Sequence, residues 1–299
     1  MRPIYLLLAV TVLGAAPACA QQRDFSKVEI KVEQLAPGVA VLFGAGGNIG
    51  LSHGADGNVL VDDQFAPLTD KILTAVKGVD SDPVKFVVNT HWHGDHSGGN
   101  ENLGKAGAVI VAHENVRRRM SVDQFSKRFG KTAASPKAAL PVVTFGQGVT
   151  LNLNGDEMQI VHVSNAHTDG DSLVYWKIGK VLHMGDTFFH QVSLPFIDLG
   201  SGGSIDGAIT AVRTGLAIAA PDAKIIPGHG PVATRADLEA YLAMLVDIRT
   251  KVATARASGQ SLVQIKAANP AKRYEVPNGF IMADAFVETV YNSIGAMPR

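Results

Sequence analysis

Short runs of alternating apolar and polar residues fill the first part of the chain, and this spacing is typical of β-strands with one buried face. Strands are therefore expected over residues 28–32, 39–43, 49–52 and 58–61. Gly- and Pro-containing turns separate the members of each pair, so the chain is expected to begin as antiparallel hairpins. Helical spacing follows over residues 68–76. After Pro83, β-branched and aromatic residues predict a largely buried strand over residues 84–90, which leads directly to His91.

The remaining pattern predicts further strands and then mainly helices. The expected strands are residues 108–112, 149–153, 158–163, 173–178, 181–184 and 224–226, and the expected helices are residues 100–103, 114–131, 206–219, 235–255 and 262–268. No linker or compositional break divides residues 21–299. We therefore predict one domain of the mixed α/β (α+β) class, in which sheet packs on sheet with helices outside.

The first twenty residues have the pattern of a secretory signal peptide. Arg2 precedes an apolar run over residues 4–13, and small residues end the segment at Ala18-Cys19-Ala20. The run is shorter than the roughly 20 residues of a membrane-spanning helix, so cleavage before Gln21 is preferred over a retained anchor. Lipid attachment at Cys19 ranks second, because the preceding residues lack the Leu-led pattern it favours. We expect a periplasmic or secreted protein with no stable membrane insertion.

Charge and cysteine content narrow the possible chemistry. The chain has 27 basic and 27 acidic residues, and loss of Arg2 with the signal leaves 26 against 27. A near-neutral exported protein is not a general nucleic-acid binder, so a small-molecule substrate is the expected partner, with the oligomeric state left open. Cys19 is the single cysteine and would leave with the signal. Histidines and carboxylates must then supply the ligands of any metal.

The strongest chemical signal is His91-Trp92-His93-Gly94-Asp95-His96, directly after the expected strand at residues 84–90. Residues two apart in an extended segment can face the same way, so His91 and His93 can share one ion. A turn at Gly94 would direct Asp95 and His96 elsewhere, toward a second ion. Imidazole and carboxylate suit zinc, and three protein ligands per ion would leave a position for water. A cluster of surface histidines is the alternative.

Three later segments also place a polar residue where a strand runs into a turn. They carry His167 in Asn165-Ala166-His167-Thr168-Asp169-Gly170, Asp186 in Gly185-Asp186-Thr187, and His229 in Pro227-Gly228-His229-Gly230. Each alone is weak, because a single His or Asp in a turn usually caps the backbone or faces solvent. Strand ends can nevertheless converge on one rim of a sheet.

Together the segments H-W-H-G-D-H, H-T-D-G, G-D-T and P-G-H-G, in this order, resemble those of the metallo-β-lactamase fold superfamily of metallohydrolases. The resemblance covers the chain from the first hairpin to about Val246. It implies an αββα sandwich with two zinc ions at one edge of the sheets. The G-D-T segment is similar to that of the glyoxalase II branch, and β-lactamases usually replace its acid, which puts a strict β-lactamase assignment in doubt.

The resemblance also implies a ligand set. His91, His93 and His167 would hold the first zinc ion, and Asp95, His96 and His229 the second, with Asp186 bridging the two. Asp62 matches an acidic position near the site of the family and would support a ligand. A turn role at the end of a strand is equally open for Asp62.

The expected reaction is hydrolysis. Two ions can share a water molecule and lower its pKa toward about 7, so that a metal-bound hydroxide attacks a carbonyl group. Asp95 would orient that hydroxide and then pass a proton to the leaving atom. The β-lactam ring is the first choice of substrate, ahead of lactones, esters and thioesters. A redox or metal-binding protein without hydrolase activity, with iron or manganese in place of zinc, is a further alternative.

A basic segment over residues 117–137 lies between the metal motifs. It carries seven cationic side chains at Arg117, Arg118, Arg119, Lys127, Arg128, Lys131 and Lys137. One hypothesis is that it covers the site and pairs with a substrate carboxylate. The preferred interpretation is a solvated helix with a stripe of apolar residues facing the core.

Overall fold

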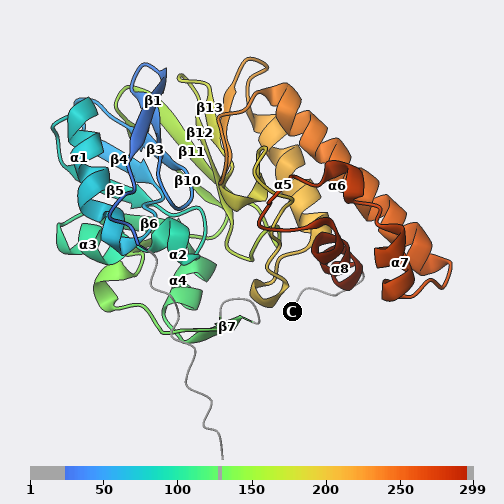
Figure 1. Ribbon diagram of the computed structural model, residues 1–299. Coiled ribbons are helices and arrows are strands. Elements are labelled where there is room, and N and C mark those ends of the chain that lie inside the picture. Colours follow the sequence, from blue (N-terminus) through green and yellow to red (C-terminus); the bar gives the residue numbers. More distant parts are fainter. Residues whose placement is uncertain (1–23, 127–129, 295–299) are drawn as a thin grey trace, which may run out of the picture.

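The computed structural model describes residues 24–126 and 130–294, and two sheets packed face to face form its centre (Figure 1). The first sheet has the order β1 (Lys31–Ala36), β2 (Val39–Phe43), β3 (Ile49–Ser52), β4 (Asn58–Val61), β5 (Val84–Val88), β6 (Val109–His113) and β9 (Val143–Phe145). The second has the order β10 (Gly148–Leu153), β11 (Asp156–His162), β12 (Ser172–Trp176), β13 (Val181–His183) and β14 (Lys224–Ile226).

Helices cover the outer face of each sheet, which completes the αββα sandwich that the sequence predicted (Figure 1). The helices that follow strands of the first sheet are α1 (Thr69–Val79), α2 (Gly94–Ser97), α3 (Asn100–Lys105) and α4 (Glu114–Met120). Those on the side of the second sheet are α5 (Ile205–Ile218), α6 (Arg235–Ala257), α7 (Leu262–Ala268) and α8 (Ala283–Ser293). A small hairpin of β7 (Gln124–Ser126) and β8 (Gly130–Thr132) stands apart from both sheets.

Alternation along the strands sorts the apolar side chains into layers. Val59 and Val61 of β4 pack in the cluster between the sheets, together with Trp176 of the second sheet. Leu60, one residue away, points to the opposite face and packs with Ile72 of α1. Because side chains of a strand alternate between its two faces, a sheet covered on both sides needs apolar residues at every position. This explains the unbroken apolar runs of the central strands.

Parallel strand pairs bring the motif segments to one edge. In the first sheet β4 runs parallel to β5, and in the second β13 runs parallel to β14. The carboxyl ends of these strands lead to Asp62, His91, Asp186 and His229. Asn48 ties the two sheets together at this edge, since its backbone N–H donates to Gly228 O at 2.8 Å.

Two sequence expectations about single elements were wrong. The helix expected over residues 114–131 ends at Met120, and the chain then forms the β7–β8 hairpin. Asp123 accounts for part of this change, because its carboxylate accepts from the N–H of Ala134 and pairs with Lys131 across the hairpin. The first strand begins three residues later than expected, at Lys31.

The predicted signal peptide at residues 1–20 lies outside the described residues, as do Lys127 and Arg128 of the basic segment. Cleavage, export and the limits of the domain therefore stay predictions. Within the part of the chain that the structure describes, no helix has both the length and the apolar character needed to span a bilayer.

Candidate metal centre

One group of potential ligands consists of His91, His93, His167 and Asp186, all buried. One ligand atom from each lies within 4.8 Å of the others. Nδ1 of His93 stands 2.9 Å from Nε2 of His167, and Oδ2 of Asp186 stands 3.6 Å from the same Nε2. Residues as far apart in the sequence as His91 and Asp186 thus share one small volume.

A second group consists of Asp95, His96 and His229, again within 4.8 Å of one another. Asp95 and His96 belong to α2, which begins directly after His93 and so turns these two side chains away from those of His91 and His93. Nε2 of His229 lies 3.3 Å from Nε2 of His96 and 3.4 Å from Oδ2 of Asp95. The division of the six-residue motif between two groups matches the expectation from its spacing.

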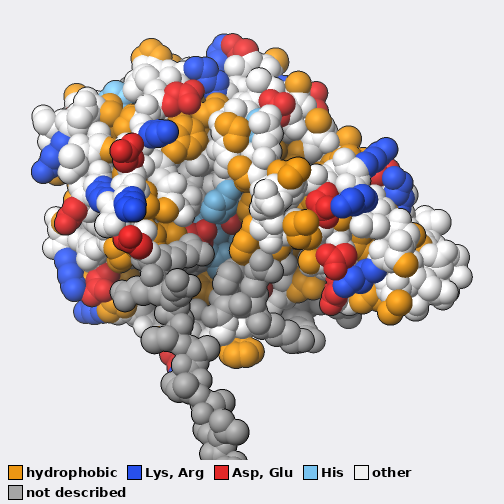
Figure 2. All heavy atoms as spheres, viewed as in Figure 1, with side chains coloured by type: hydrophobic (Ala, Val, Ile, Leu, Met, Phe, Trp, Pro, Cys, Tyr) orange, Lys and Arg blue, Asp and Glu red, His pale blue; other side chains and the backbone are white. Residues whose placement is uncertain are grey.

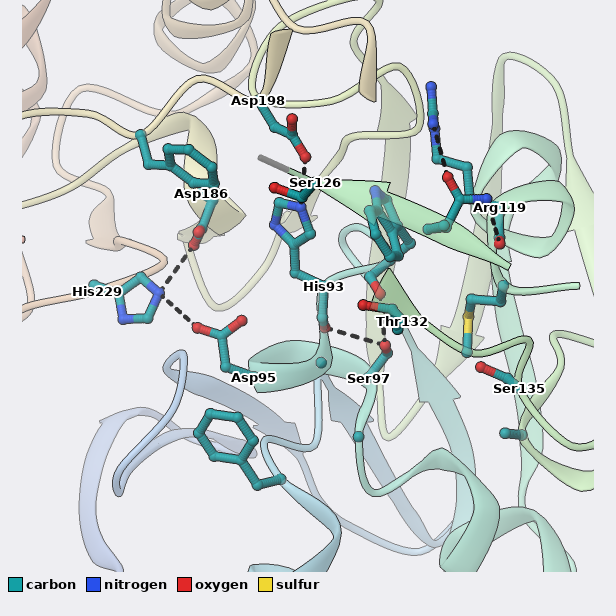
Figure 3. Close-up of a pocket in the computed structure, with 18 of the residues that line it drawn as sticks. His93, Asp95, Ser97, Arg119, Ser126, Thr132, Ser135, Asp186, Asp198 and His229 are labelled. Carbon is teal, nitrogen blue, oxygen red and sulfur yellow. Dashed lines mark hydrogen bonds and ion pairs between the residues drawn. The ribbon is translucent and has the colours of Figure 1, made fainter. Parts of the chain in front are cut away.

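Asp186 contacts ligands of both groups, and Figure 3 shows its carboxylate directed toward His229. Its Oδ2 faces the first group, whereas its Oδ1 lies 3.0 Å from Nε2 of His96 and 3.4 Å from Nε2 of His229. Gly228 leaves room for this carboxylate, because a Cβ at that position would stand 2.1 Å from Oδ1. The glycine before His229 is therefore required by the close approach of the backbone to Asp186.

The donor set fits divalent cations. At the centre of the site, Nε2 of His91 is buried and lacks a hydrogen-bond partner. Buried polar groups are nearly always satisfied, and a position reserved for a metal ion is one standard reason for an exception. Imidazole nitrogen and carboxylate oxygen together suit zinc and similar borderline metals. The arrangement thus has the chemistry of a metal-binding site, with two groups of potential ligands.

Hydrogen bonds behind the first group fix which ring nitrogens face the centre. Nε2–H of His93 donates to Oδ2 of Asp198 at 3.1 Å, which leaves Nδ1 as the donor toward a metal. Nδ1–H of His167 donates to Phe196 O at 2.6 Å, which leaves Nε2. Asp198 is itself held by the hydroxyl of Ser201 at 2.6 Å. Such carboxylate–histidine pairs orient the ring and increase its basicity as a ligand.

Asp62 supports the second group in the same way. It is fully buried, and its carboxylate lies 2.7 Å from Nδ1 of His96, which leaves Nε2 of that ring for a metal. The same carboxylate accepts from the backbone N–H and the hydroxyl of Thr90, both at 2.7 Å. Asp62 adopts a left-handed backbone conformation with φ of 66°. The residue thus joins the end of β4 to the motif that follows β5.

The electrostatics of the two groups differ. Burial lowers the pKa of His167 to about 4, so this ring is a neutral donor at pH 7. Burial alone would also lower the pKa of His229, but Asp186 and Asp95 raise it to about 9. Burial opposes ionisation of Asp95, yet His96 and His229 lower its pKa to about 2. The carboxylates around the second group thus stabilise positive charge, and a bound cation would take the place of the ring protons.

The sequence of residues 43–229 matches the metallo-beta-lactamase superfamily, and all seven candidate ligands lie within that range. The chain belongs to this superfamily. Members are metal-dependent hydrolases. A hydroxyacylglutathione hydrolase of Erythrobacter litoralis is 25% identical over 107 residues, which are 36% of this chain and 35% of that protein. The match thus spans about a third of that relative.

Solved structures of this superfamily share the fold. A metallo-beta-lactamase from Pontibacter korlensis has a TM-score of 0.59 at 21% identity and covers 73% of this chain and 100% of its own. A stereoselective inverting sec-alkylsulfatase from Pseudomonas sp. has a TM-score of 0.65 at 16% identity and covers 88% of this chain and 50% of its own. At these identities the likeness concerns the fold and leaves the substrate open.

The structure brings together all seven residues that the sequence singled out as ligands, and it adds two supporting carboxylates that sequence reasoning missed. One is Asp198, behind His93. The other is Asp171, which accepts from the N–H groups of His167 and Thr168 at 2.6 and 2.7 Å. Asp171 follows the H-T-D-G segment directly, so its place in the sequence was a usable signal. Asp198 carried no comparable signal.

Among the described residues of the basic segment, Arg119 is the cation that lines the pocket, and it is paired. Uncharged residues of the segment, Met120 and Val122 among them, line the pocket next to the metal centre, as does Arg119. The guanidinium of Arg119, however, donates to both carboxylate oxygens of Asp169 at 2.7 and 2.8 Å. Lys131 pairs with Asp123 on the hairpin. The hypothesis of pairing with a substrate carboxylate therefore finds no support among the described residues.

Proposed function

We propose that this chain is a two-zinc hydrolase that adds hydroxide to the carbonyl carbon of an acyl substrate. The observation that carries the proposal is the position of Asp186, with one carboxylate oxygen toward each group of ligands. When bound, two zinc ions would lower the pKa of water toward about 7 and offset the charge that develops on the substrate oxygen.

The residues of the chain have distinct roles in this proposal. His91, His93 and His167 would hold one ion, Asp95, His96 and His229 would hold the other, and Asp186 would contribute to both. The side chain of Asp95 is about one-third exposed and lines the pocket, so it faces the reacting groups. Its carboxylate accepts a proton as the water attacks and returns that proton to the leaving atom.

Carboxylic esters, lactones and thioesters are the substrate class that the site favours. The acid at Asp186 is the feature shared with the glyoxalase II branch, and the curated relative is named for hydrolysis of a hydroxyacylglutathione. β-Lactam ring opening, the first choice from sequence, is kept as second candidate, because solved metallo-beta-lactamases share the fold across almost three-quarters of the chain.

The test compares a chromogenic cephalosporin, an acyl lactone and an acyl thioester with mature, zinc-loaded protein. A chelator-treated sample and the Asp95→Asn variant serve as controls. We expect chelator-sensitive turnover of the lactone or thioester and a loss of about 10²-fold or more in Asp95→Asn. Turnover of the cephalosporin alone would move the function to the second candidate. Unchanged turnover in Asp95→Asn would contradict the role of Asp95, and two bound irons without hydrolysis would favour redox chemistry.

A further inference from the structure

A cavity of about 630 Å³ extends from the metal centre toward the β7–β8 hairpin. A volume of this size holds a ligand much larger than an acetyl group. His229, Asp95 and Asp186 lie at its inner end, and Figure 2 shows histidine side chains at the bottom of a hollow on this face of the molecule. The cavity therefore has room for a substantial acyl group next to the reacting carbonyl.

One wall of the cavity is a continuous series of rings that begins at the metal centre. The ring of Phe196 stacks on that of His93, with centroids 5.9 Å apart. Phe280 makes an edge contact with Phe196 at 6.0 Å and is about half exposed. An apolar surface thus leads from a metal-ligand histidine to the mouth of the cavity.

The other walls carry further apolar side chains, beside polar ones such as Gln124 and Thr132 of the hairpin. Trp92 and Met120 are buried, and Val122 is 53% exposed at the rim. Phe189 stacks on His229 and lines the cavity beside it. Burial of an alkyl chain between these walls would remove apolar surface from water on both partners.

The distribution of charge in the cavity also favours an uncharged ligand. Among the described residues that line it, Arg119 is the basic side chain other than histidine, and Asp169 already neutralises it. Glu101 is paired with Lys105 at 2.6 Å. The other charged groups are carboxylates at the metal centre. A second anionic group on the substrate would therefore meet no unpaired cation among the described residues of the cavity wall, so its desolvation would be costly.

We propose that this cavity selects an uncharged alkyl or aryl-alkyl acyl chain, so that the preferred substrates are esters, lactones or thioesters of medium- to long-chain acids without a second charged group. This inference rests on the proposed hydrolase function for its catalytic readout. Its binding readout is independent of hydrolysis.

The kinetic test uses phenyl esters of linear acids with four to ten carbons, and half-esters of dicarboxylic acids of the same lengths. We expect kcat/KM of the neutral esters to rise about three- to fourfold per added CH₂, the factor that burial of a methylene supports. The distal carboxylate of the half-esters should reduce kcat/KM at least about tenfold relative to the neutral ester of equal length. A flat length dependence, or equal turnover of the half-esters, would overturn the inference.

A matched pair of variants locates the effect. Val122→Lys places a cation on the cavity rim and should raise turnover of the half-esters about tenfold while lowering that of the neutral esters. Val142→Lys places the same charge on an exposed valine that does not line the cavity, and it should change neither. Equal effects of the two substitutions would show that the cavity does not hold the chain. Phe280→Ala shortens the wall of rings, and it should reduce the increase in kcat/KM per added CH₂ for the longest acyl chains alone.

A binding experiment separates the cavity assignment from the proposed hydrolase function. Calorimetry measures the Kd of linear methyl ketones with five to nine carbons for the zinc-loaded protein. We expect Kd to fall about three- to fourfold per added CH₂. A Kd that does not depend on chain length would overturn the cavity assignment even if esters are hydrolysed. Length-dependent ketone binding without hydrolysis of any ester, lactone or thioester would overturn the proposed function and leave the cavity assignment standing.

Discussion

The two halves of the metal centre are built differently. In the first, His91, His93 and His167 are buried, and ring orientation is fixed from behind by Asp198 and by the carbonyl of Phe196. In the second, His96 is buried on Asp62, but the side chains of Asp95 and His229 are 31% and 25% exposed (Figure 3). The first half is therefore a preorganised binding site, of which His93 lines the cavity, whereas the second exposes more of its ligands there.

This difference explains how one sheet edge can provide both affinity for metal ions and access for a substrate. A buried ligand set with fixed tautomers loses little entropy when it binds an ion. Partly exposed ligands remain accessible to substrate and water. Asp186 contacts ligands of both halves, so its removal should have the largest effect on metal binding.

Asp186→Ala should release ions from both halves and reduce kcat/KM by about 10³-fold, because each half loses a charged ligand. Metal content per chain by mass spectrometry and turnover of the best substrate measure the two effects. Asp222→Ala, which removes an exposed acid paired with Lys180, is the control and should retain both ions. Two ions per chain in Asp186→Ala would contradict the bridging position.

His91→Ala and His229→Ala compare the halves directly. His91→Ala removes a buried ligand and should empty the site of both ions, because only the more exposed ligands of the second half then remain intact. His229→Ala should leave one ion and lower kcat/KM by about 10²-fold. Metal titration of both variants checks this order, and full occupancy in either one would refute the ligand assignment.

The supporting carboxylates allow each half to be weakened separately. Asp198→Asn should reduce affinity for the ion of the first half by about 10- to 100-fold, and Asp62→Asn should do the same for the second. Asparagine also tolerates the left-handed backbone of Asp62. Competition with a chromophoric chelator measures the two affinities. Equal weakening of both ions in either variant would show that the halves are not independent.

The smallest expected effect is a pair of opposite pH dependences in chelated protein. The pKa of His167, about 4 in the folded state, lies below the value of about 6.5 in an unfolded chain, so its contribution is lost as pH falls from 6.5 toward 4. The pKa of His229 is raised to about 9, so its contribution is present below 6.5 and lost as pH rises through 9.

Urea unfolding across this pH range tests the pair. His167→Gln should flatten the acidic side of the stability profile, and His229→Gln the alkaline side. The same slope change in both variants would mean that the two rings share one environment.

Local signals in the sequence predicted the strands and the division of the His91–His96 motif, whereas the αββα layering and the full ligand set were implied by the family resemblance. Alternating and continuous apolar runs define the strands, and a motif placed directly after a strand is carried to the end of that strand. The motif at His91 shows this most clearly, since residues 84–90 were identified as a buried strand and β5 ends at Val88.

Features that depend on distant partners could not be predicted. Asp198 acquires its role only when the chain folds back onto His93, 105 residues away. The hairpin after Met120 was mistaken for helix because basic and apolar residues alternate there at a spacing compatible with either. Arg119 was a candidate for substrate binding until the structure placed Asp169 against it. Tertiary contacts decided each case.

The arrangement of the β7–β8 hairpin has an evolutionary consequence. None of the seven candidate ligands lies between His96 and His167, yet this intervening stretch supplies Met120, Val122 and other residues of the cavity wall. Insertions, deletions and substitutions can accumulate there while the catalytic metals keep their ligands. One inherited reaction can thus be directed to new compounds by changes in a single stretch of the gene.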